Sequence, residues 1–243
     1  MLHVRSAVPA DMATILAFID EAAGWLSDKG TDQWSTPWPD EEQRDGRVRR
    51  GIEDGCTWMV HDNSLTIGTI SCRPAGNPNL WSPDENNELA VYVSRLIVCR
   101  DYAGQGIGNE LFDWAGKWAT AQYGARWIRI DVWTTNGMLH DYYQKRGFDF
   151  VRKCDYVDYP SAMLFQKRTS DITDADVPRL REVPELKRPP NWMPPSEPLV
   201  PPQRRRRIRQ QLAGVANTRR AVGIAARMAR IALIHGSRDA HRD

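Results

Sequence analysis

Three glycines within five residues mark the segment of this chain whose chemistry is most specific. The segment reads AGQGIGNELFDWA, from Ala103 to Ala115, and its glycines are Gly104, Gly106 and Gly108. They stand where a helix should begin, although each glycine costs about 1 kcal/mol of helix propensity relative to alanine. Backbone N–H groups at a helix start bind anions, and glycine lets a phosphate approach them closely. The segment therefore predicts a site for a phosphorylated cofactor.

Two common phosphate-binding loops do not fit this spacing. A nucleoside triphosphate loop contains Gly-Lys followed by serine or threonine, and this segment has no such sequence. The dinucleotide fingerprint is GxGxxG, whereas Asn109 occupies the position of its third glycine. An acidic residue for a ribose is not evident about twenty residues further on. Both cofactor classes are therefore disfavoured.

The sequence VCRDYAGQGIGNELFDWA resembles motif A of the GNAT superfamily of acyl-CoA N-acyltransferases. That motif is usually written (R/Q)xxGx(G/A), and Gly106 and Gly108 match its glycine positions. Ala103 stands at the first position, where the family has arginine or glutamine, so one side-chain contact is lost. Whether Arg100 or Gln105 compensates stays open. The resemblance implies that backbone amides and the helix macrodipole bind the pyrophosphate of coenzyme A.

A second motif supports the same resemblance. Members of the family end their fifth strand in a valine, place an asparagine shortly after it and continue into a helix that reads YxxxGF. The sequence NGMLHDYYQKRGF follows that pattern, and the preceding strand ends in a valine. The matching residues are Val132, Asn136, Tyr143, Gly147 and Phe148. The resemblance covers roughly residues 2–168, with both motifs in register.

The resemblance also implies where the cofactor lies. Two central strands splay, and the pantetheine arm lies between them against the backbone of Leu96, Ile97 and Val98, as an added strand would. The Val98 N–H would polarise the thioester carbonyl, and Asn136 would hydrogen-bond the pantetheine while capping its helix. The implied cosubstrate is acetyl-CoA, and no metal is implied. The cofactor-binding candidates are Leu96, Ile97, Val98, Ala103, Gly104, Gln105, Gly106, Ile107, Gly108, Asn109 and Asn136.

Acyl transfer to an amine needs a base for the amine proton and an acid for the leaving thiolate. The resemblance implies Tyr143 as the acid, and the alternative is an aromatic residue of the core. The identity of the base stays open between two carboxylates, Asp131 and Glu88. Asp131 lies among apolar strand residues, where an unpaired carboxylate is costly, so it is either a site residue or a partner of Arg95 or Arg129. Glu88 begins another strand, and the alternative to a role as the base is a position on the solvated surface.

The acceptor pocket is expected to use the first helix and the loop GTDQW. Arg95 lies inside an apolar strand, so it needs a partner, and an acidic group of the acceptor would supply one. The substrate-binding candidates are Trp25, Asp32, Gln33, Trp34 and Arg95.

Hydrophobic periodicity and turn residues predict the elements that position these residues. Strands are expected over 2–7, 56–60, 64–72, 88–99, 125–133, 148–157 and 161–168. Helices are expected after Pro9, over 40–54, from 107 to about 123 and from Asn136 to Gly147, with a loop over 73–87. This order matches the GNAT fold, an α/β (α+β) architecture in which helices cover both faces of a mixed sheet of about seven strands.

The composition changes after the predicted GNAT domain, residues 1–168. A Pro-rich linker is expected over 169–202, because 184–202 alone contain eight prolines. Residues 203–243 hold eleven arginines and two aspartates, and they predict a basic helix. A solvated extension, contact with an anionic membrane surface, contact with nucleic acid and contact with a protein partner all stay open for this tail.

Bulk properties are ordinary for a soluble globular chain. Its 243 residues are 41% hydrophobic, and its four cysteines are far apart, which argues against a zinc site or a disulfide scaffold. A signal peptide pattern and a long apolar run are not evident, so a cytoplasmic location is expected. We predict an N-acetyltransferase that transfers acetyl from acetyl-CoA to a primary amine by direct attack in a ternary complex, with a small molecule or a peptide as the amine acceptor. The alternative is a non-catalytic CoA-binding GNAT-fold regulatory module whose basic tail binds a partner, a membrane surface or nucleic acid. The oligomeric state, including a homodimer, stays open.

Overall fold

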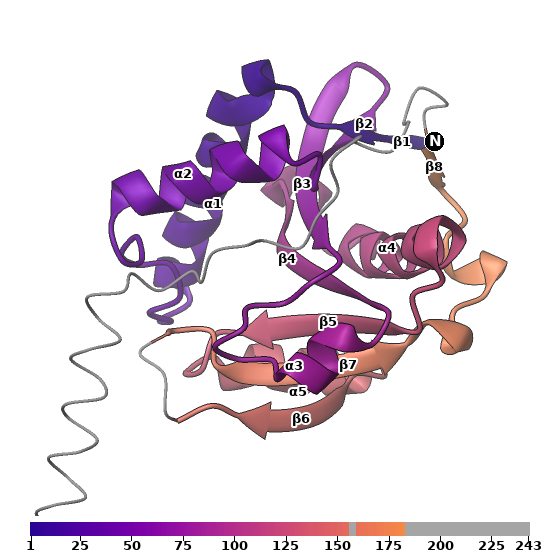
Figure 1. Ribbon diagram of the computed structural model, residues 1–243. Helices are drawn as coiled ribbons and strands as arrows, with labels where there is room; N and C mark the ends of the chain where they lie inside the picture. The colour runs from indigo at the N-terminus through magenta and orange to yellow at the C-terminus, as the bar shows by residue number, and fades with distance from the viewer. Residues whose placement is uncertain (156–158, 183–243) are drawn as a thin grey trace, which may run out of the picture. The chain divides into compact units, whose positions relative to one another are not determined.

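A computed structural model describes residues 1–155 and 159–182, which lie within one compact unit (Figure 1). The described strands form one eight-stranded sheet in the order β6-β7-β5-β4-β3-β2-β1-β8. They are β1 (Leu2–Ser6), β2 (Thr57–Asp62), β3 (Leu65–Arg73), β4 (Ala90–Val98), β5 (Trp127–Val132), β6 (Asp149–Lys153), β7 (Met163–Arg168) and β8 (Leu180–Glu182). Parallel and antiparallel pairs both occur, which confirms the expected mixed sheet.

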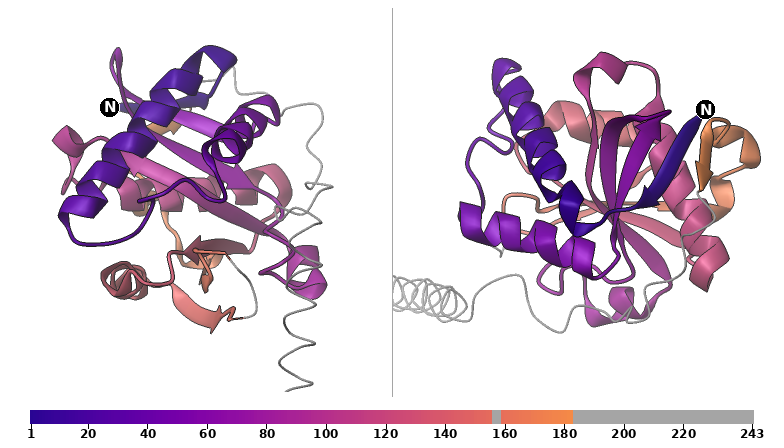
Figure 2. Two further views of the ribbon diagram at one scale, coloured as in Figure 1. Left: turned by 90° about the vertical axis from the view of Figure 1, so that its left-hand side faces the viewer. Right: turned by 90° about the horizontal axis from the view of Figure 1, so that it is seen from above.

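Helices cover both faces of this sheet. They are α1 (Met12–Asp28), α2 (Glu41–Glu53), α3 (Pro83–Asn87), α4 (Ile107–Tyr123) and α5 (Gly137–Lys145). Side chains alternate across a strand, so Met59 of β2 packs with α1 and α2, whereas Trp58 and Val60 pack with α4 on the opposite face. Figure 2 shows the pair α1 and α2 separated from α4 by the strands.

Local signals explain where the helices begin and end. Asp40 caps α2 by accepting a hydrogen bond from the N–H of Gln43 at 2.8 Å. Asn136 caps α5 in the same way through the N–H of Leu139 at 3.1 Å, and Gly147 follows that helix with a φ of +80°. The expected cap and the expected glycine stop of this helix are both confirmed.

The expectation of a plain loop over 73–87 is wrong at its end, because α3 forms there. Ser82 accepts a hydrogen bond from the N–H of Glu85 at 3.2 Å, and the Glu85 carboxylate accepts one from the N–H of Ser82 at 2.7 Å. Pro83 occupies the first helical position. The sequence SPDE is therefore a capping box with proline after the cap, a signal that was present in the sequence.

The centre of the sheet opens because β4 and β5 pair over only part of their length. Their parallel pairing runs from Ala90 opposite Trp127 to Tyr92 opposite Arg129, and it stops there although both strands continue. Figure 1 shows the two strands close at their first residues and apart at their last ones. One edge of β4 is therefore unpaired toward its end.

The sheet continues beyond residue 168, which is the expected end of the domain. β8 pairs in parallel with β1, and the N–H of Leu2 donates to the carbonyl of Arg179 at 3.0 Å. Glu110 of α4 is only 4% exposed, and its carboxylate accepts from the backbone N–H groups of Arg179 and Leu180 at 2.5 and 3.0 Å. The first part of the expected linker therefore belongs to this folded unit.

Other expectations lie outside the described residues. These are residues 156 and 157 of the strand expected over 148–157, the part of the expected linker after residue 182, and the basic helix expected over 203–243. Within the described chain, no helix combines the length and the apolar character needed to cross a membrane.

Two truncations separate the contribution of β8 from that of the residues after it. A chain without residues 184–243 keeps every partner of Glu110 that the structure describes, so we expect unchanged stability and unchanged affinity for coenzyme A. A chain that ends at residue 168 leaves the buried Glu110 carboxylate unpaired, and we expect its free energy of unfolding to fall by about 3 kcal/mol. Urea unfolding followed by tryptophan fluorescence measures both. Equal stability of the two truncated chains would show that β8 does not stabilise the domain.

Candidate active site

A cavity of about 1100 Å³ opens where β4 and β5 diverge. Residues of α1 and of the loop after it form one wall, and α2 contributes to it. The end of β4, the glycine loop and the start of α4 form a second wall, and β5 and α5 form a third. Both sequence motifs therefore face one space.

The glycine loop owes its shape to two left-handed residues. Gly104 has a φ of +77° and Gly106 a φ of +76°, and Gly106 is the N-cap of α4. Residues other than glycine rarely adopt this backbone conformation. The N–H of Asn109 donates to the carbonyl of Gly106 at 3.1 Å, whereas those of Ile107 and Gly108 have no backbone acceptor among the described residues. The start of α4 therefore presents free donors and the positive end of the macrodipole beside the cavity. Gly108 differs, because a methyl group there would make only an ordinary contact of 3.5 Å with Leu96.

This difference predicts opposite effects for two alanine variants. Gly106→Ala forces alanine into a left-handed conformation, so we expect a loss of about 1 kcal/mol of stability. Gly108→Ala should keep or raise stability through its better helix propensity and keep its affinity for coenzyme A, because the family motif accepts alanine at this position. Gly106→Ala should instead bind coenzyme A about tenfold more weakly, because its methyl group would hold the phosphate off. Thermal unfolding and calorimetric titration measure the two effects. Undiminished coenzyme A affinity in Gly106→Ala would contradict the close approach.

The end of β4 directs part of its backbone into the gap. The carbonyl of Ile97 points at β3, since a methyl group on Gly68 would lie 2.4 Å from its oxygen, and the N–H of Cys99 donates to Ile67 on β3 at 2.8 Å. Backbone groups of successive strand residues point to opposite edges. The N–H and carbonyl of Val98 therefore face the gap beside β5, which suits an extended ligand.

Asn136 and Gln33, two candidates from distant motifs, are in direct contact. The Asn136 amide donates to the Gln33 side-chain oxygen at 2.8 Å, and both residues are buried in the cavity wall. Asp32 accepts hydrogen bonds from the Trp133 indole at 3.0 Å and from the Thr135 hydroxyl at 2.5 Å, which lower its pKa. Asp32 does not line the cavity as described, so it fastens the loop to the segment between β5 and α5.

Tyr143 lines the cavity from α5. Its ring packs edge-to-face on Phe112 and on Phe148, with centroids 5.6 Å apart in both pairs. Burial raises the pKa of its hydroxyl, so Tyr143 stays protonated at neutral pH. A protonated phenol held by packing can act as a proton donor.

Asp131 lines the same cavity from β5, two residues beyond the last pairing of that strand with β4. Burial raises the pKa of its carboxyl to about 6, and the Tyr159 hydroxyl and the charge of Arg95 offset part of that rise. A carboxylate with this pKa is ionised at neutral pH and accepts a proton more readily than an ordinary aspartate.

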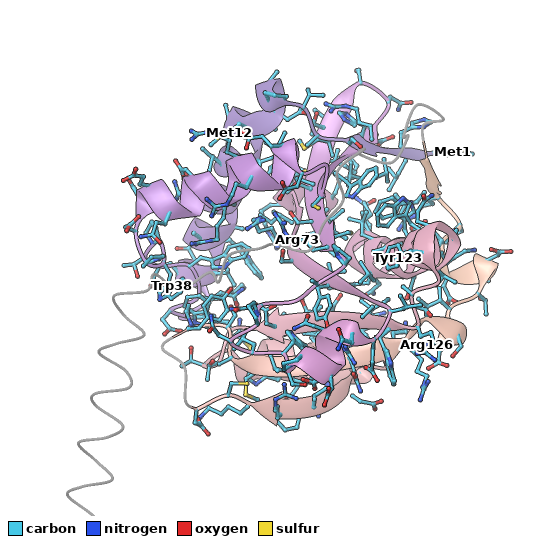
Figure 3. The ribbon with its side chains drawn as sticks, in the orientation of Figure 1. Met1, Met12, Trp38, Arg73, Tyr123 and Arg126 are labelled. Atoms are coloured by element: carbon cyan, nitrogen blue, oxygen red, sulfur yellow. The ribbon has the colours of Figure 1, made fainter. Side chains whose placement is uncertain are left out.

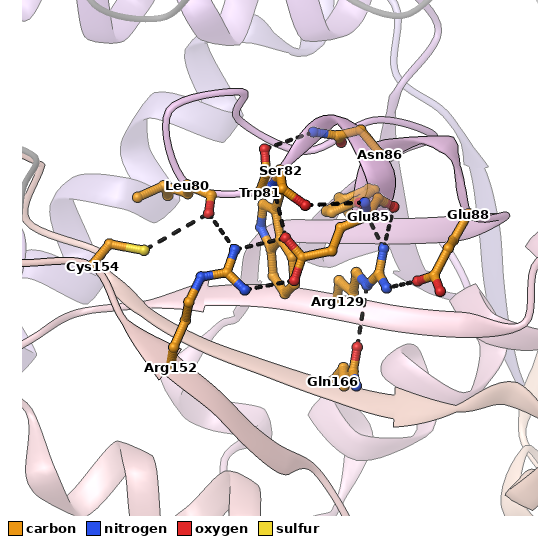
Figure 4. Close-up of polar contacts among 11 residues, drawn as sticks. Leu80, Trp81, Ser82, Glu85, Asn86, Glu88, Arg129, Arg152, Cys154 and Gln166 are labelled. Carbon is orange, nitrogen blue, oxygen red and sulfur yellow. Dashed lines mark hydrogen bonds and ion pairs between the residues drawn. The ribbon is translucent and has the colours of Figure 1, made fainter.

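Glu88, the other carboxylate proposed as a base, lies elsewhere. It precedes β4, at the end of that strand remote from the glycine loop, and it is absent from the cavity lining that the structure describes. Its carboxylate pairs with the guanidinium of Arg129, which is 2% exposed (Figure 4). The structure therefore places Glu88 in an ion pair with a core arginine.

Most of the remaining candidates line the cavity, and Gln105 does not. Trp25, Trp34 and Arg95 line the cavity, as do most residues of the glycine loop. The guanidinium of Arg100 lies 4.0 Å from the centroid of the Trp25 ring, so it stacks on the acceptor side of the site. Gln105 is outside the described lining, and its carbonyl accepts from Arg179 at 2.9 Å. Gln105 therefore connects the loop to the segment before β8.

Several lining residues were not predicted from the sequence. Arg146, at the end of α5, lines the cavity and lies 5.4 Å from the ring of Tyr142. The Tyr142 hydroxyl hydrogen-bonds Asn109 at 2.6 Å, which brings this pair to the start of α4. The signal for Arg146 was its place directly before the glycine of the second motif. Arg47 and Tyr159 also line the cavity, and they had no recognisable motif.

Comparison with known proteins agrees with this architecture. Residues 20–148 match the model of the acetyltransferase (GNAT) family. The uncharacterized N-acetyltransferase YesJ of Bacillus subtilis (strain 168) is 29% identical over 148 residues, which are 60% of this chain and 80% of YesJ. A GNAT-family acetyltransferase structure from Listeria monocytogenes 4b F2365 has a TM-score of 0.57 and 25% identity, and covers 68% of this chain and 93% of that one.

A second GNAT-family structure, from Streptococcus agalactiae 2603, has a TM-score of 0.53 at 17% identity, and covers 69% of this chain and 95% of that one. At this identity the likeness concerns the fold alone. The family match extends over more than half of the chain and includes both motifs that face the cavity. The chain therefore belongs to the GNAT acetyltransferase family and is an acyltransferase enzyme with N-acetyltransferase activity.

Proposed function

We propose that the protein transfers an acetyl group from acetyl-CoA to a primary amine by direct attack within a ternary complex. The observation that carries the proposal is one cavity lined by the glycine loop at a helix start, an unpaired strand edge, a protonated tyrosine and a carboxylate of raised pKa. Each of these groups supplies one requirement of the reaction.

The backbone holds the donor in this proposal. The first amides of α4 bind the pyrophosphate, and Arg146 adds a positive charge near them. The free edge of β4 hydrogen-bonds the pantetheine amides, and the N–H of Val98 faces the thioester carbonyl, where it stabilises the developing oxyanion. Asn136 is buried beside this path, and its amide is oriented by Gln33.

Two side chains then move the protons. Asp131 takes one proton from the bound ammonium group, and the neutral nitrogen forms a bond with the carbonyl carbon. The bond between that carbon and sulfur breaks, and Tyr143 donates its proton to the departing thiolate. The second amine proton restores the phenol, and Asp131 releases its proton to solvent. The products are an amide and free coenzyme A, so a covalent acyl-enzyme is not required.

Turnover of an amine panel tests this proposal. The full chain is incubated with acetyl-CoA and primary amines of differing charge and shape, and thiol release and acetylated products are measured together. We expect at least one amide product whose formation depends on Tyr143. Binding of acetyl-CoA without turnover of any amine would favour the alternative, a non-catalytic module that binds coenzyme A.

A further inference from the structure

Three arginines meet between α2 and the sheet, beside the acceptor side of the cavity. They are Arg47 on α2, Arg73 at the end of β3 and Arg95 on β4. A methyl group on Gly51 of α2 would lie 3.5 Å from one terminal nitrogen of Arg73 and 3.5 Å from one of Arg95, so these guanidinium groups lie within about 7 Å of each other. Figure 3 shows Arg73 near α2. Burial and the charges of Arg73 and Arg47 lower the pKa of Arg95 to about 10.

Acidic partners compensate this positive cluster only in part. Arg73 pairs with Asp54 at 3.1 Å, and Arg47 donates to the carbonyl of Trp38. No carboxylate of the described chain lies within 4.0 Å of Arg95 or Arg47. Asp131 acts on Arg95 only at longer range. A partly buried guanidinium without a paired anion loses hydration without gaining a partner, so this arrangement suits a ligand that brings the anion.

The backbone directs Arg95 to this position. Ser71 pairs with Ser94 and Thr69 pairs with Ile97, so Arg95 and the next residue together face one residue of β3 in a β-bulge. Arg95 has a φ of +46°, which is uncommon for any residue except glycine. Bulges re-aim side chains, and strained residues of this kind cluster at ligand sites.

The surroundings of Arg95 are aromatic. Trp34, Trp38 and Tyr159 line the cavity together with Arg95 and Arg47. The Arg47 guanidinium lies 5.7 Å from the centroid of the Trp38 ring. Aromatic walls exclude water and so strengthen a charge-assisted hydrogen bond between a guanidinium and an oxyanion.

We infer that the acceptor is an amine that also carries an oxyanion, either a carboxylate or a phosphate-type group, which Arg95 binds with support from Arg47. This inference rests on the proposed function, because it assigns the amine end of the acceptor to Asp131. Arginine suits this role because its planar fork binds two oxygens of a carboxylate or phosphate at once.

Three matched amines test the inference. They are 4-(aminomethyl)benzoate, 4-(aminomethyl)phenylphosphonate and the uncharged 4-(aminomethyl)benzamide. With the full chain, we expect kcat/KM for one or both anions to exceed that for the amide at least tenfold, and the better anion identifies the class of oxyanion. Arg95→Gln should reduce this preference about tenfold or more, whereas Arg49→Gln, an exposed arginine on the same helix as Arg47, should leave it unchanged. The ratio of two kcat/KM values measured on one preparation does not depend on the fraction of enzyme that is folded.

Calorimetry of the same three probes, without acetyl-CoA, separates this inference from the proposed function. Anion binding that requires Arg95, without acetylation, would support the subsite and contradict the transferase proposal. If the amide is acetylated as fast as both anions, the inferred oxyanion subsite is wrong and the proposed transferase activity stands. If Arg95→Gln does not fold, Arg95→Lys keeps the charge and loses the fork, and we expect it to show a reduced anion preference. An unchanged preference in that variant would also overturn the inference.

Discussion

Replacing Tyr143 by phenylalanine should lower kcat about 10²- to 10³-fold, with less than a threefold change in KM for acetyl-CoA. The phenyl ring keeps its packing on Phe112 and Phe148, whereas the proton for the departing thiolate is lost. Because burial raises the pKa of this hydroxyl, the loss should be nearly constant from pH 6 to pH 9. Steady-state assays of thiol release over that pH range measure it.

Tyr123→Phe is the matched control for that variant. Tyr123 is a partly buried tyrosine of α4 outside the described cavity lining, and its hydroxyl donates to the carbonyl of Ala90 at 3.3 Å. Removing this hydroxyl should change kcat less than twofold. A kcat for Tyr143→Phe within threefold of the unaltered enzyme would assign Tyr143 to packing, and the thiolate would then leave without this acid.

Replacing Asp131 by asparagine should lower kcat/KM for the amine about 10²-fold at pH 7 and change the shape of its pH profile. The unaltered enzyme needs ionised Asp131 and accepts the ammonium form of the amine, so kcat/KM should rise up to pH 6 and then level off. The asparagine variant needs an amine that is already neutral. Its kcat/KM should keep rising tenfold per pH unit until the pKa of the free amine is reached.

The stability of the same variant provides a control with a definite sign. The pKa of Asp131 is raised in the folded state, so the folded chain holds this proton more tightly than the unfolded chain. Ionisation of Asp131 therefore destabilises the fold as pH rises from about 4 through about 6. Asparagine resembles the protonated form, so the variant should unfold at no lower temperature than the unaltered protein at pH 8. Parallel pH profiles of kcat/KM for the two proteins would contradict the role of Asp131 as the base.

The sequence predicted those parts of the site that local signals encode. The cap at Asn136 and the stop at Gly147 follow from residue types within a few positions. The glycines of the loop were expected for the close approach of a phosphate, whereas the left-handed conformation of Gly104 and Gly106 is a finding of the structure. The fold followed from the order of the elements and the two motifs. The capping box of α3 was equally local, and it was overlooked.

The choice between two carboxylates required the spatial structure. Asp131 and Glu88 are both acidic residues near strands. The resemblance implied that two central strands splay, but the sequence does not reveal that β4 and β5 separate after three paired positions. That divergence leaves Asp131 in the cavity and Glu88 at the closed end, beside Arg129.

Long-range contacts explain the other differences between expectation and structure. Residues 169–182 have no strong periodicity, and they are held by the buried carboxylate of Glu110 and by pairing with β1. The bulge that re-aims Arg95 depends on the register between β3 and β4. Neither a partner about 70 residues away nor a strand register follows from local propensity.

Calorimetric titration of the full chain with coenzyme A tests the central claim most directly. The account predicts one bound molecule per chain with a micromolar dissociation constant, since the first amides of α4 and the free edge of β4 both contact the ligand. Gly106→Ala should bind coenzyme A more weakly, whereas Gly108→Ala should bind it as the unaltered protein does. The absence of binding by the folded protein at millimolar coenzyme A would contradict the account.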